Sequence, residues 1–147
     1  MMQTTRILAL DLGKRRIGLA LSDELGITAQ GIDTLHRTRL REDLVKLGQL
    51  IRENNVSLIL MGNPVHMSGQ EGRQSDYSRD FAKRLQESAG VDVKLWDERL
   101  TTVEAQRVLR ESGISLQKRN QAVDRLSAVI LLESYLDSLE RQPQGEQ

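Results

Sequence analysis

An aspartate inside an apolar run is the first residue of this chain whose type and place suggest chemistry. The segment 7–23 reads ILALDLGKRRIGLALSD, and Asp11 lies within the first of its two apolar runs. A carboxylate in a buried strand is costly unless a cation or hydrogen-bond donors meet it. Asp11 therefore either pairs with the basic run Lys14–Arg16 that follows it or belongs to a functional site.

A second acid stands at the end of another apolar segment. Residues 91–97 read VDVKLWD, and Glu98 comes directly after them. Successive strand residues point to opposite faces, so Asp97 and Glu98 cannot both face one site while extended. We favour Glu98, because its longer side chain can reach back from beyond the strand. A surface ion pair with Arg99 is the alternative for this residue.

A third acid, Asp124, begins a helical stripe that is otherwise apolar. It is followed at helical spacing by Ala128, Leu131 and Tyr135. An acid at the start of a core-facing stripe indicates a site, although a carboxylate near a helix N-terminus is also favoured by the helix macrodipole.

The remaining pattern predicts the elements that must bring these acids together. Apolar runs bounded by turn residues predict strands, and apolar residues at a spacing of three and four predict helices. The predicted strands cover 6–12, 16–22, 26–35, 57–62 and 91–97, and the predicted helices cover 40–54, 73–89, 101–112 and 123–139. Polar residues, proline and glycine predict loops at 63–72 and 115–121. A capping box, Thr101-x-x-Glu104, opens the third helix.

This order predicts an α/β fold. The first three strands can form an antiparallel meander, and the last two each follow a helix, so right-handed crossovers lay them parallel to the first. We expect a five-stranded mixed sheet in the order 3-2-1-4-5 with helices on both faces. Residues 1–139 form one domain and residues 140–147 a flexible tail.

Composition favours a single-domain protein without disulfides or thiolate metal sites. The 147 residues are 38% hydrophobic, enough for one core, and include no cysteine, which excludes disulfides and thiolate metal ligands. The chain has 21 basic and 21 acidic residues and therefore zero formal net charge. Arg37, Arg39 and Arg41 could form a local basic surface, but three arginines in a solvated loop would give the same sequence pattern. The apolar runs are short and interrupted by charge, so we expect a soluble, cytosolic protein.

The predicted topology places the three acids at one edge of the sheet. Strands 1, 4 and 5 run parallel, so their carboxyl ends meet there, where open α/β sheets bind ligands. A cluster of carboxylates suits Mg²⁺ or Mn²⁺ better than zinc. The two histidines, His36 and His66, have no metal-ligand spacing.

Four motifs resemble a known family. DLGKRRIG after the first strand, GNP after the fourth, DERLTT after the fifth and VDRLSAVILLESYL in the last helix are similar to those of the YqgF-type Holliday junction resolvase-like proteins, also named pre-16S rRNA nucleases. The resemblance spans 6–135. Two positions depart from the family pattern: Asn63 replaces a usual Leu, and Thr101 replaces a usual Ser but keeps the hydroxyl.

The resemblance implies a ribonuclease H-like fold and a metal-dependent nuclease. It implies that Asp11, Glu98 and Asp124 are catalytic and bind Mg²⁺ or Mn²⁺. We expect substrate contacts from Gly13, Lys14, Arg16, Asn63, Arg99, Lys118 and Arg119. A salt bridge to Asp97 or Glu104 would also explain Arg99, and a plain turn would explain Gly13.

The expected function is hydrolysis of phosphodiester bonds in maturation of the 5′ end of pre-16S rRNA, with RNA as the partner. One alternative is a Holliday junction resolvase that cuts branched DNA, and another is a non-catalytic nucleic-acid-binding factor. A third is a kinase or ATPase of the actin–hexokinase type, because DLGKRRIG also fits Asp-x-Gly-x-x-x-x-Gly, but such enzymes need two domains. Without a self-complementary apolar stripe, we expect a monomer rather than a homodimer.

Overall fold

The protein is built on a single mixed sheet. A computed structural model describes residues 6–13, 15–63, 71–97 and 116–141. The strand order is β3-β2-β1-β4-β5, as the sequence predicts. The strands are β1 (Arg6–Leu12), β2 (Arg16–Ser22), β3 (Ala29–His36), β4 (Val56–Asn63) and β5 (Asp92–Asp97).

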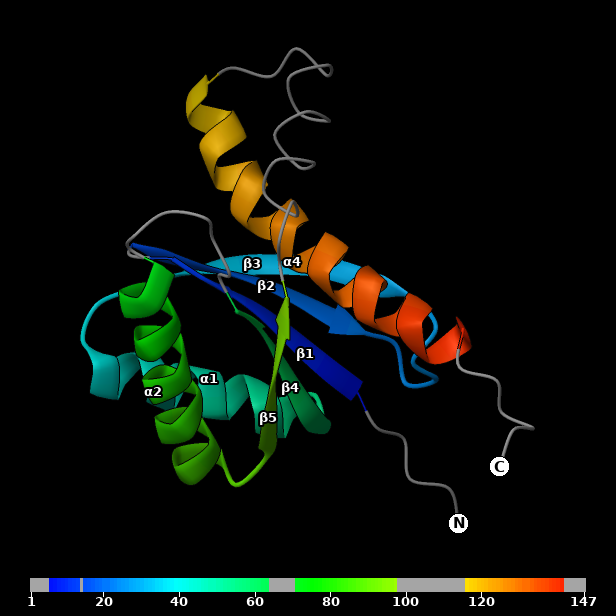
Figure 1. Ribbon diagram of the computed structural model, residues 1–147, viewed down its shortest axis with the longest axis horizontal. Helices are drawn as coiled ribbons and strands as arrows, with labels where there is room; N and C mark the ends of the chain where they lie inside the picture. Colours follow the sequence, from blue (N-terminus) through cyan, green and yellow to red (C-terminus); the bar gives the residue numbers. More distant parts are fainter. Residues whose placement is uncertain (1–5, 14, 64–70, 98–115, 142–147) are drawn as a thin grey trace.

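Strand directions follow from the connections. β1 pairs antiparallel with β2, and β2 pairs antiparallel with β3, so these three strands form the expected meander. β4 pairs parallel with β1, and β5 pairs parallel with β4. Helix α1 (Leu40–Glu53) lies between β3 and β4, and α2 (Glu71–Ala89) lies between β4 and β5. The carboxyl ends of β1, β4 and β5 therefore meet at the upper edge of the sheet in Figure 1.

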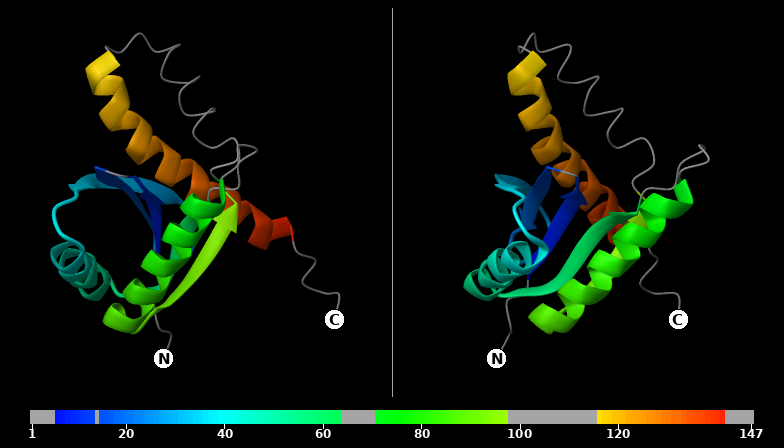
Figure 2. Two further views of the ribbon diagram at one scale, coloured as in Figure 1. Left: turned by 60° about the vertical axis from the view of Figure 1, so that its left-hand side comes forward. Right: turned by 90° about the vertical axis from the view of Figure 1, so that its left-hand side faces the viewer.

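Helices cover both faces of the sheet (Figures 1 and 2). The long helix α4 (Leu116–Arg141) crosses one face over β1, β2 and β3, while α1 and α2 lie on the other. Each face has its own apolar core. The core beside α1 and α2 includes Leu8, Leu10, Ile17, Leu19, Leu47, Ile59, Met61, Phe81 and Leu85. The core beneath α4 includes Ala9, Ala20, Leu60, Ala128, Leu131, Leu132, Tyr135 and Leu136.

Because side chains alternate along a strand, β1 contributes side chains to both cores. Leu8 and Leu10 pack with the core of α1 and α2, whereas Ile7 and Ala9 pack with the core of α4. Ala9 and Ala20 are fully buried, and their small side chains allow α4 to lie close to the sheet. The next residue of β1 on the same face as Ile7 and Ala9 is Asp11.

β3 begins later than the sequence predicts. The expected start was residue 26, but the strand begins at Ala29, because Asp23 closes a turn first. Asp23 Oδ1 accepts hydrogen bonds from the backbone N–H groups of Ile27 at 2.7 Å and Thr28 at 3.1 Å. These two bonds lower the pKa of Asp23 below its ordinary value. They also remove residues 27 and 28 from the strand ladder.

The loop expected at 115–121 is wrong for the part that the structure describes, because α4 already begins at Leu116. The sequence LQKRNQ lacks apolar spacing, which was the reason for expecting a loop. Leu, Gln, Lys and Arg are nevertheless good helix formers, so a polar, basic segment can extend a helix whose packed part lies further on. At its other end α4 continues to Arg141, so the first two residues of the expected tail are helical.

The loop expected at 63–72 is shorter than predicted. Asn63 belongs to β4, while Glu71 and Gly72 belong to α2. The sequence marked this loop by proline and glycine, but a glycine in the first turn of a helix is tolerated, and Asn63 extends the ladder by pairing with Asp97. The predicted helix at 101–112 lies outside the described residues.

Candidate active site

Asp11 lies at the carboxyl end of β1, as predicted, and is half-buried. It shares the parity of Ile7 and Ala9, whose side chains pack with the core of α4. This parity places Asp11 on the face of the sheet that α4 crosses. This edge of the sheet is the one that the site hypothesis requires.

Glycines flank Asp11 on both neighbouring strands. Across the antiparallel ladder, Asp11 pairs with Gly18 of β2. On the other side, Leu10 pairs with Met61 of β4, so the register continued by one residue brings Asp11 level with Gly62. Neither neighbour has a side chain that would fill the surface beside the carboxylate. Both glycines are buried, so Asp11 is flanked by backbone alone at these two positions of the sheet.

The turn after Asp11 requires glycine at position 13. The Gly13 N–H donates to the carbonyl oxygen of Arg16 at 3.0 Å. A Cβ atom at Gly13 would lie 2.6 Å from that same oxygen, closer than carbon and oxygen can approach without a shift. The prediction of a turn glycine is consistent with this geometry.

Arg37 stabilises this turn through two hydrogen bonds. Its Nη1 donates to the Gly13 carbonyl oxygen at 2.9 Å, and its backbone N–H donates to the Arg15 carbonyl oxygen at 2.9 Å. Its guanidinium carbon also lies 5.4 Å from the ring centroid of Phe81 and 5.7 Å from that of Tyr77. Arg37 thereby links the turn after Asp11 to helix α2.

Asp43 in turn holds Arg37. Its Oδ2 accepts from Arg37 Nε at 3.3 Å, and its Oδ1 accepts from the Thr38 backbone N–H at 3.0 Å. Asp43 is fully buried in the first turn of α1. The sequence allowed a solvated loop for the arginine cluster and gave Arg37 and Asp43 no role. The available signal was the helical spacing of Asp43 from Leu47 and Ile51, an acid on an apolar stripe.

Two predicted contact residues lie on strands that reach the site. Arg16 is the first residue of β2, half-buried and paired with His36 of β3. Asn63 is the last residue of β4 and pairs with Asp97, the last residue of β5. Position 97 has the parity of Val93 and Leu95, which pack with the core of α1 and α2. Trp96, which is described, packs with the core of α4.

The structure describes only some of the other predicted site residues. Lys118 and Arg119 lie within α4 rather than in the predicted loop. Asp124 lies within α4, as predicted, and precedes Ala128 by one helical turn. Lys14, Glu98 and Arg99 lie outside the described residues. Among the side chains that the structure does describe, no group of three or more acidic or histidine residues is arranged to hold a metal ion.

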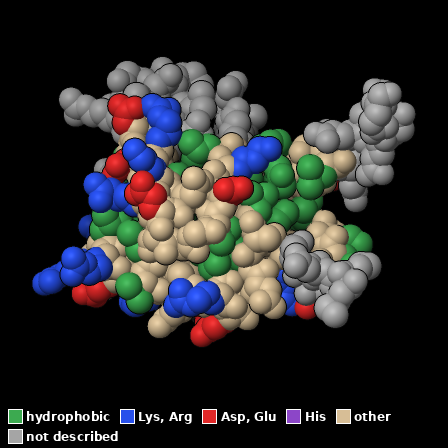
Figure 3. Space-filling model, turned by 90° about the horizontal axis from the view of Figure 1, so that it is seen from below, with side chains coloured by type: hydrophobic (Ala, Val, Ile, Leu, Met, Phe, Trp, Pro, Cys, Tyr) green, Lys and Arg blue, Asp and Glu red, His purple; other side chains and the backbone are tan. Residues whose placement is uncertain are grey.

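Basic and acidic side chains are mixed on one side of the described structure. Figure 3 views the molecule from below, the side on which β1 and β4 begin, and its Lys and Arg side chains are interspersed with Asp and Glu. This agrees with the zero net charge. The view shows no single basic patch on this side of the described structure.

Comparison with known proteins identifies the family. The model of the RuvX family, described as a Holliday junction resolvase, matches residues 5–138. The chain belongs to the RuvX family. A relative from Koribacter versatilis is 52% identical over 132 residues, which cover 90% of this chain and 86% of the relative. One from Bacillus subtilis is 45% identical over 136 residues, which cover 91% and 99%. Both carry the name "Putative pre-16S rRNA nuclease".

Solved structures confirm the ribonuclease H-like fold of this RuvX-family chain. Thermus thermophilus RuvC in complex with a Holliday junction superposes with a TM-score of 0.57 at 12% identity, covering 93% of this chain and 96% of RuvC. The Fowlpox virus resolvase superposes with a TM-score of 0.56 at 14% identity, covering 92% and 99%. The family and its relatives support a nuclease and agree with the sequence resemblance. Within the described residues, no helix has both the length and the apolarity needed to cross a membrane.

Proposed function

We propose that this chain is a divalent-metal-dependent nuclease that hydrolyses phosphodiester bonds in the cytoplasm, in the maturation of the 5′ end of pre-16S rRNA. One structural observation carries the proposal. Asp11 lies at the carboxyl end of β1 on the face crossed by α4, level with a glycine on each neighbouring strand. The names of the curated relatives supply the RNA substrate.

Asp11, Glu98 and Asp124 would hold Mg²⁺ or Mn²⁺. Their carboxylate oxygens are the hard donors that these ions prefer. The placement of Asp11, and of position 124 one turn before the packed residue Ala128, fits this assignment. Trp96 packs with the core of α4, and the strand alternation counted from Trp96 favours Glu98 over Asp97. When bound, the metal would activate a water molecule and stabilise the leaving oxygen.

The chain's own residues would orient the nucleic acid. The turn at Gly13 lets the backbone approach a phosphate closely, and the flanking Lys14 and Arg16 supply positive charge. Arg99 matches the geometry of a phosphate oxygen pair. Lys118 and Arg119, in the first turns of α4, would contact the strand backbone without reading its sequence, and Asn63 at the end of β4 would contact it at the rim.

Substitution of the three carboxylates tests the nuclease. Asp11→Asn, Glu98→Gln and Asp124→Asn should each reduce Mn²⁺-dependent cleavage by more than the roughly 10–100-fold that supporting residues cost. Asp92→Asn on β5 and Glu133→Gln on α4 are matched controls, because both residues are exposed and each change also turns a carboxylate into an amide. If all three site variants cut like the unchanged protein, the site is wrong.

Cleavage of branched DNA is the second candidate, favoured by the description of the family model as a Holliday junction resolvase. A resolvase that cuts two strands symmetrically should act as a dimer, whereas RNA processing needs only the monomer that we favour. Matched single-stranded RNA, single-stranded DNA and four-way-junction substrates, digested with Mn²⁺, separate the two. Sedimentation at working concentration gives the oligomeric state. Binding without any metal-dependent product would indicate a non-catalytic factor.

A further inference from the structure

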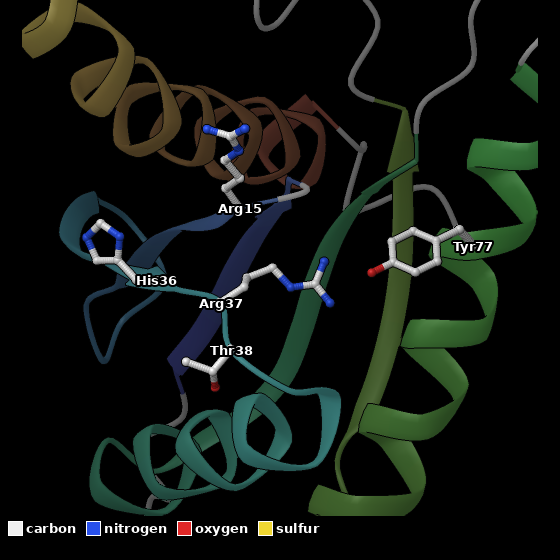
Figure 4. Close-up of a pocket in the computed structure, with 5 residues that line it drawn as sticks. All are labelled: Arg15, His36, Arg37, Thr38 and Tyr77. Atoms are coloured by element: carbon white, nitrogen blue, oxygen red, sulfur yellow. The ribbon is translucent and has the colours of Figure 1, made fainter.

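We propose that a pocket on the α1 and α2 side of the sheet is a second nucleic-acid contact, which binds one nucleotide of a single-stranded segment next to the bond that is cut. The pocket has a volume of about 520 Å³ and is lined by Arg15, His36, Arg37, Thr38 and Tyr77 (Figure 4). This volume lies within the usual range for small-ligand sites. The inference rests on the proposed nuclease function for its choice of nucleic acid as the ligand.

The pocket is tied to the turn that follows Asp11. Arg15 belongs to this turn, and its carbonyl oxygen accepts the backbone N–H of Arg37. Arg37 Nη1 also donates to the carbonyl oxygen of Gly13. Arg15 is four positions after Asp11, and four chain steps span at most about 15 Å. One strand of nucleic acid can therefore pass from Asp11 over the turn and into the pocket.

Arg37 presents a rigid guanidinium to the pocket. Asp43 engages its Nε and Gly13 engages its Nη1, so its orientation is fixed before any ligand arrives. Among the described residues no further hydrogen-bond acceptor meets it, and a guanidinium carries five N–H groups in a fork that matches phosphate. Figure 4 shows the group directed toward Tyr77. Because Asp43 offsets the charge of Arg37, the net positive charge of the pocket comes from Arg15.

Tyr77 offers an aromatic surface for a base. It comes from α2 and is 47% exposed, in a chain with only 3% aromatic residues. An exposed ring beside a guanidinium is the arrangement on which unpaired bases stack, at a gain of roughly 1–3 kcal/mol per base. Bases inside a duplex are already stacked on one another. The tyrosine therefore favours a single-stranded segment over a duplex.

The chemistry of the lining also favours nucleic acid. Two arginines, a histidine, a threonine and a tyrosine surround the pocket, and no carboxylate lines it among the described residues. Arg15 is exposed, and the part of the chain that the structure describes gives it no ion pair. An anion with an attached planar ring satisfies both the arginines and the tyrosine.

Filter binding of a single-stranded RNA oligonucleotide in EDTA tests the pocket separately from catalysis. Tyr77→Ala should weaken binding by about 5- to 150-fold, the equivalent of one lost stacking contact, while Tyr77→Phe should stay within about twofold. Arg15→Ala should weaken binding and lower the slope of log K against log salt by about 0.7, the value for one phosphate contact on a single strand. Lys83→Ala, an exposed cation on α2 outside the pocket lining, is the control.

The outcomes separate this inference from the proposed nuclease. If Tyr77→Ala and Arg15→Ala bind like the Lys83→Ala control, the pocket is not a nucleic-acid contact, even where the unchanged protein cuts RNA. If they lose binding as expected, the contact holds, even where no substrate is cut with any metal. A blunt duplex that binds as tightly as the single strand, with no loss on Tyr77→Ala, would also overturn the inference.

Discussion

Arg37 Nε lies 3.3 Å from Asp43 Oδ2, and the two side chains are 11% and 1% exposed. This ion pair is almost fully buried, and it joins three segments. Asp43 opens α1, Arg37 precedes that helix, and through Gly13 the guanidinium reaches the turn after β1. The position of the candidate catalytic strand end is thus coupled to a charge pair on the opposite face of the sheet.

Removal of one partner from this pair should be strongly destabilising. Asp43→Ala leaves the Arg37 guanidinium in a buried place without its carboxylate, and such a loss costs about 3–5 kcal/mol. Urea denaturation of the two proteins measures the difference in the free energy of unfolding. Asp80→Ala is the matched control, because Asp80 pairs with Arg84 on the surface of α2, where both side chains are more than half exposed. There the cost should be at most about 1 kcal/mol. Equal losses in the two variants would contradict the structural role of Arg37–Asp43.

Substitution of Gly13 should distort the turn. In Gly13→Ala the new Cβ would meet the Arg16 carbonyl oxygen at 2.6 Å, a backbone atom that cannot move without disturbing β2. Overpacking of this kind costs about 1–3 kcal/mol, and thermal unfolding should show it as a lower Tm.

Gly48→Ala provides the opposite case within the same chain. Gly48 lies inside α1, and a Cβ there would approach only the flexible end of Arg52, at 3.4 Å. Alanine is the better helix former by about 0.5–1 kcal/mol, so this variant should be as stable as the unchanged protein or more stable. Stabilisation by Gly13→Ala would show that the turn has another conformation.

The absence of a side chain at position 62, level with Asp11, should be needed for metal binding. Gly62→Val places a branched side chain on β4 at the position level with Asp11, and valine suits a strand. We expect Mn²⁺ binding measured by calorimetry to weaken by at least about tenfold, the lower bound for disturbed supporting residues. Ser57→Val makes a similar change at an exposed position near the start of the same strand and should bind Mn²⁺ normally. Unchanged binding in Gly62→Val would remove the argument from the flanking glycines.

The turn at Asp23 should make stability depend on pH in the acid range. Hydrogen bonds from the backbone N–H groups of Ile27 and Thr28 lower the pKa of Asp23 in the folded protein below its ordinary value of 3.8. A lowered carboxyl pKa contributes stability above pH 3.8, and this contribution is lost as the pH falls through the folded value. Urea midpoints from pH 7 to pH 2 should show a gap between the unchanged protein and Asp23→Ala that shrinks below pH 3.8. A gap that is constant over the whole range would contradict the assignment.

The sheet was predictable because its determinants are local or topological. Alternation of Leu8, Ala9 and Leu10 marks a strand that is buried on both faces, and the handedness of crossovers then fixes the order of β1, β4 and β5. The start of α4 was missed because residues 116–121 have no apolar spacing. Where a helix extends beyond the residues that pack on the sheet, its sequence has no apolar spacing to reveal it. The start of β3 was missed because the Asp23 carboxylate takes two N–H groups that the strand would otherwise use.

For the candidate site, the sequence predicted where Asp11 lies, while its grouping with Glu98 and Asp124 stays a prediction. Asp11 stood out as a carboxylate in an apolar run, and its strand and its edge of the sheet are those that the sequence indicates. The support of the turn by Arg37 was not predictable, because an arginine in a basic cluster gives no sign of its partner. Asp43 carried the same kind of signal as Asp124, an acid on an apolar helical stripe. That pattern alone does not distinguish a structural carboxylate from a catalytic one.

The chain contains one tryptophan, and it stands two residues before Glu98. The ring of Trp96 packs edge-on against that of Tyr135 of α4, with 5.1 Å between the ring centroids. Trp96 Nε1 donates a hydrogen bond to Ser134 Oγ at 3.2 Å, and the Lys94 ammonium lies 6.0 Å from the Trp96 ring centroid. All of the indole emission of this protein therefore arises where β5 meets α4. Any ion or nucleotide that shifts this junction should change the fluorescence, so the unlabelled protein carries its own optical reporter.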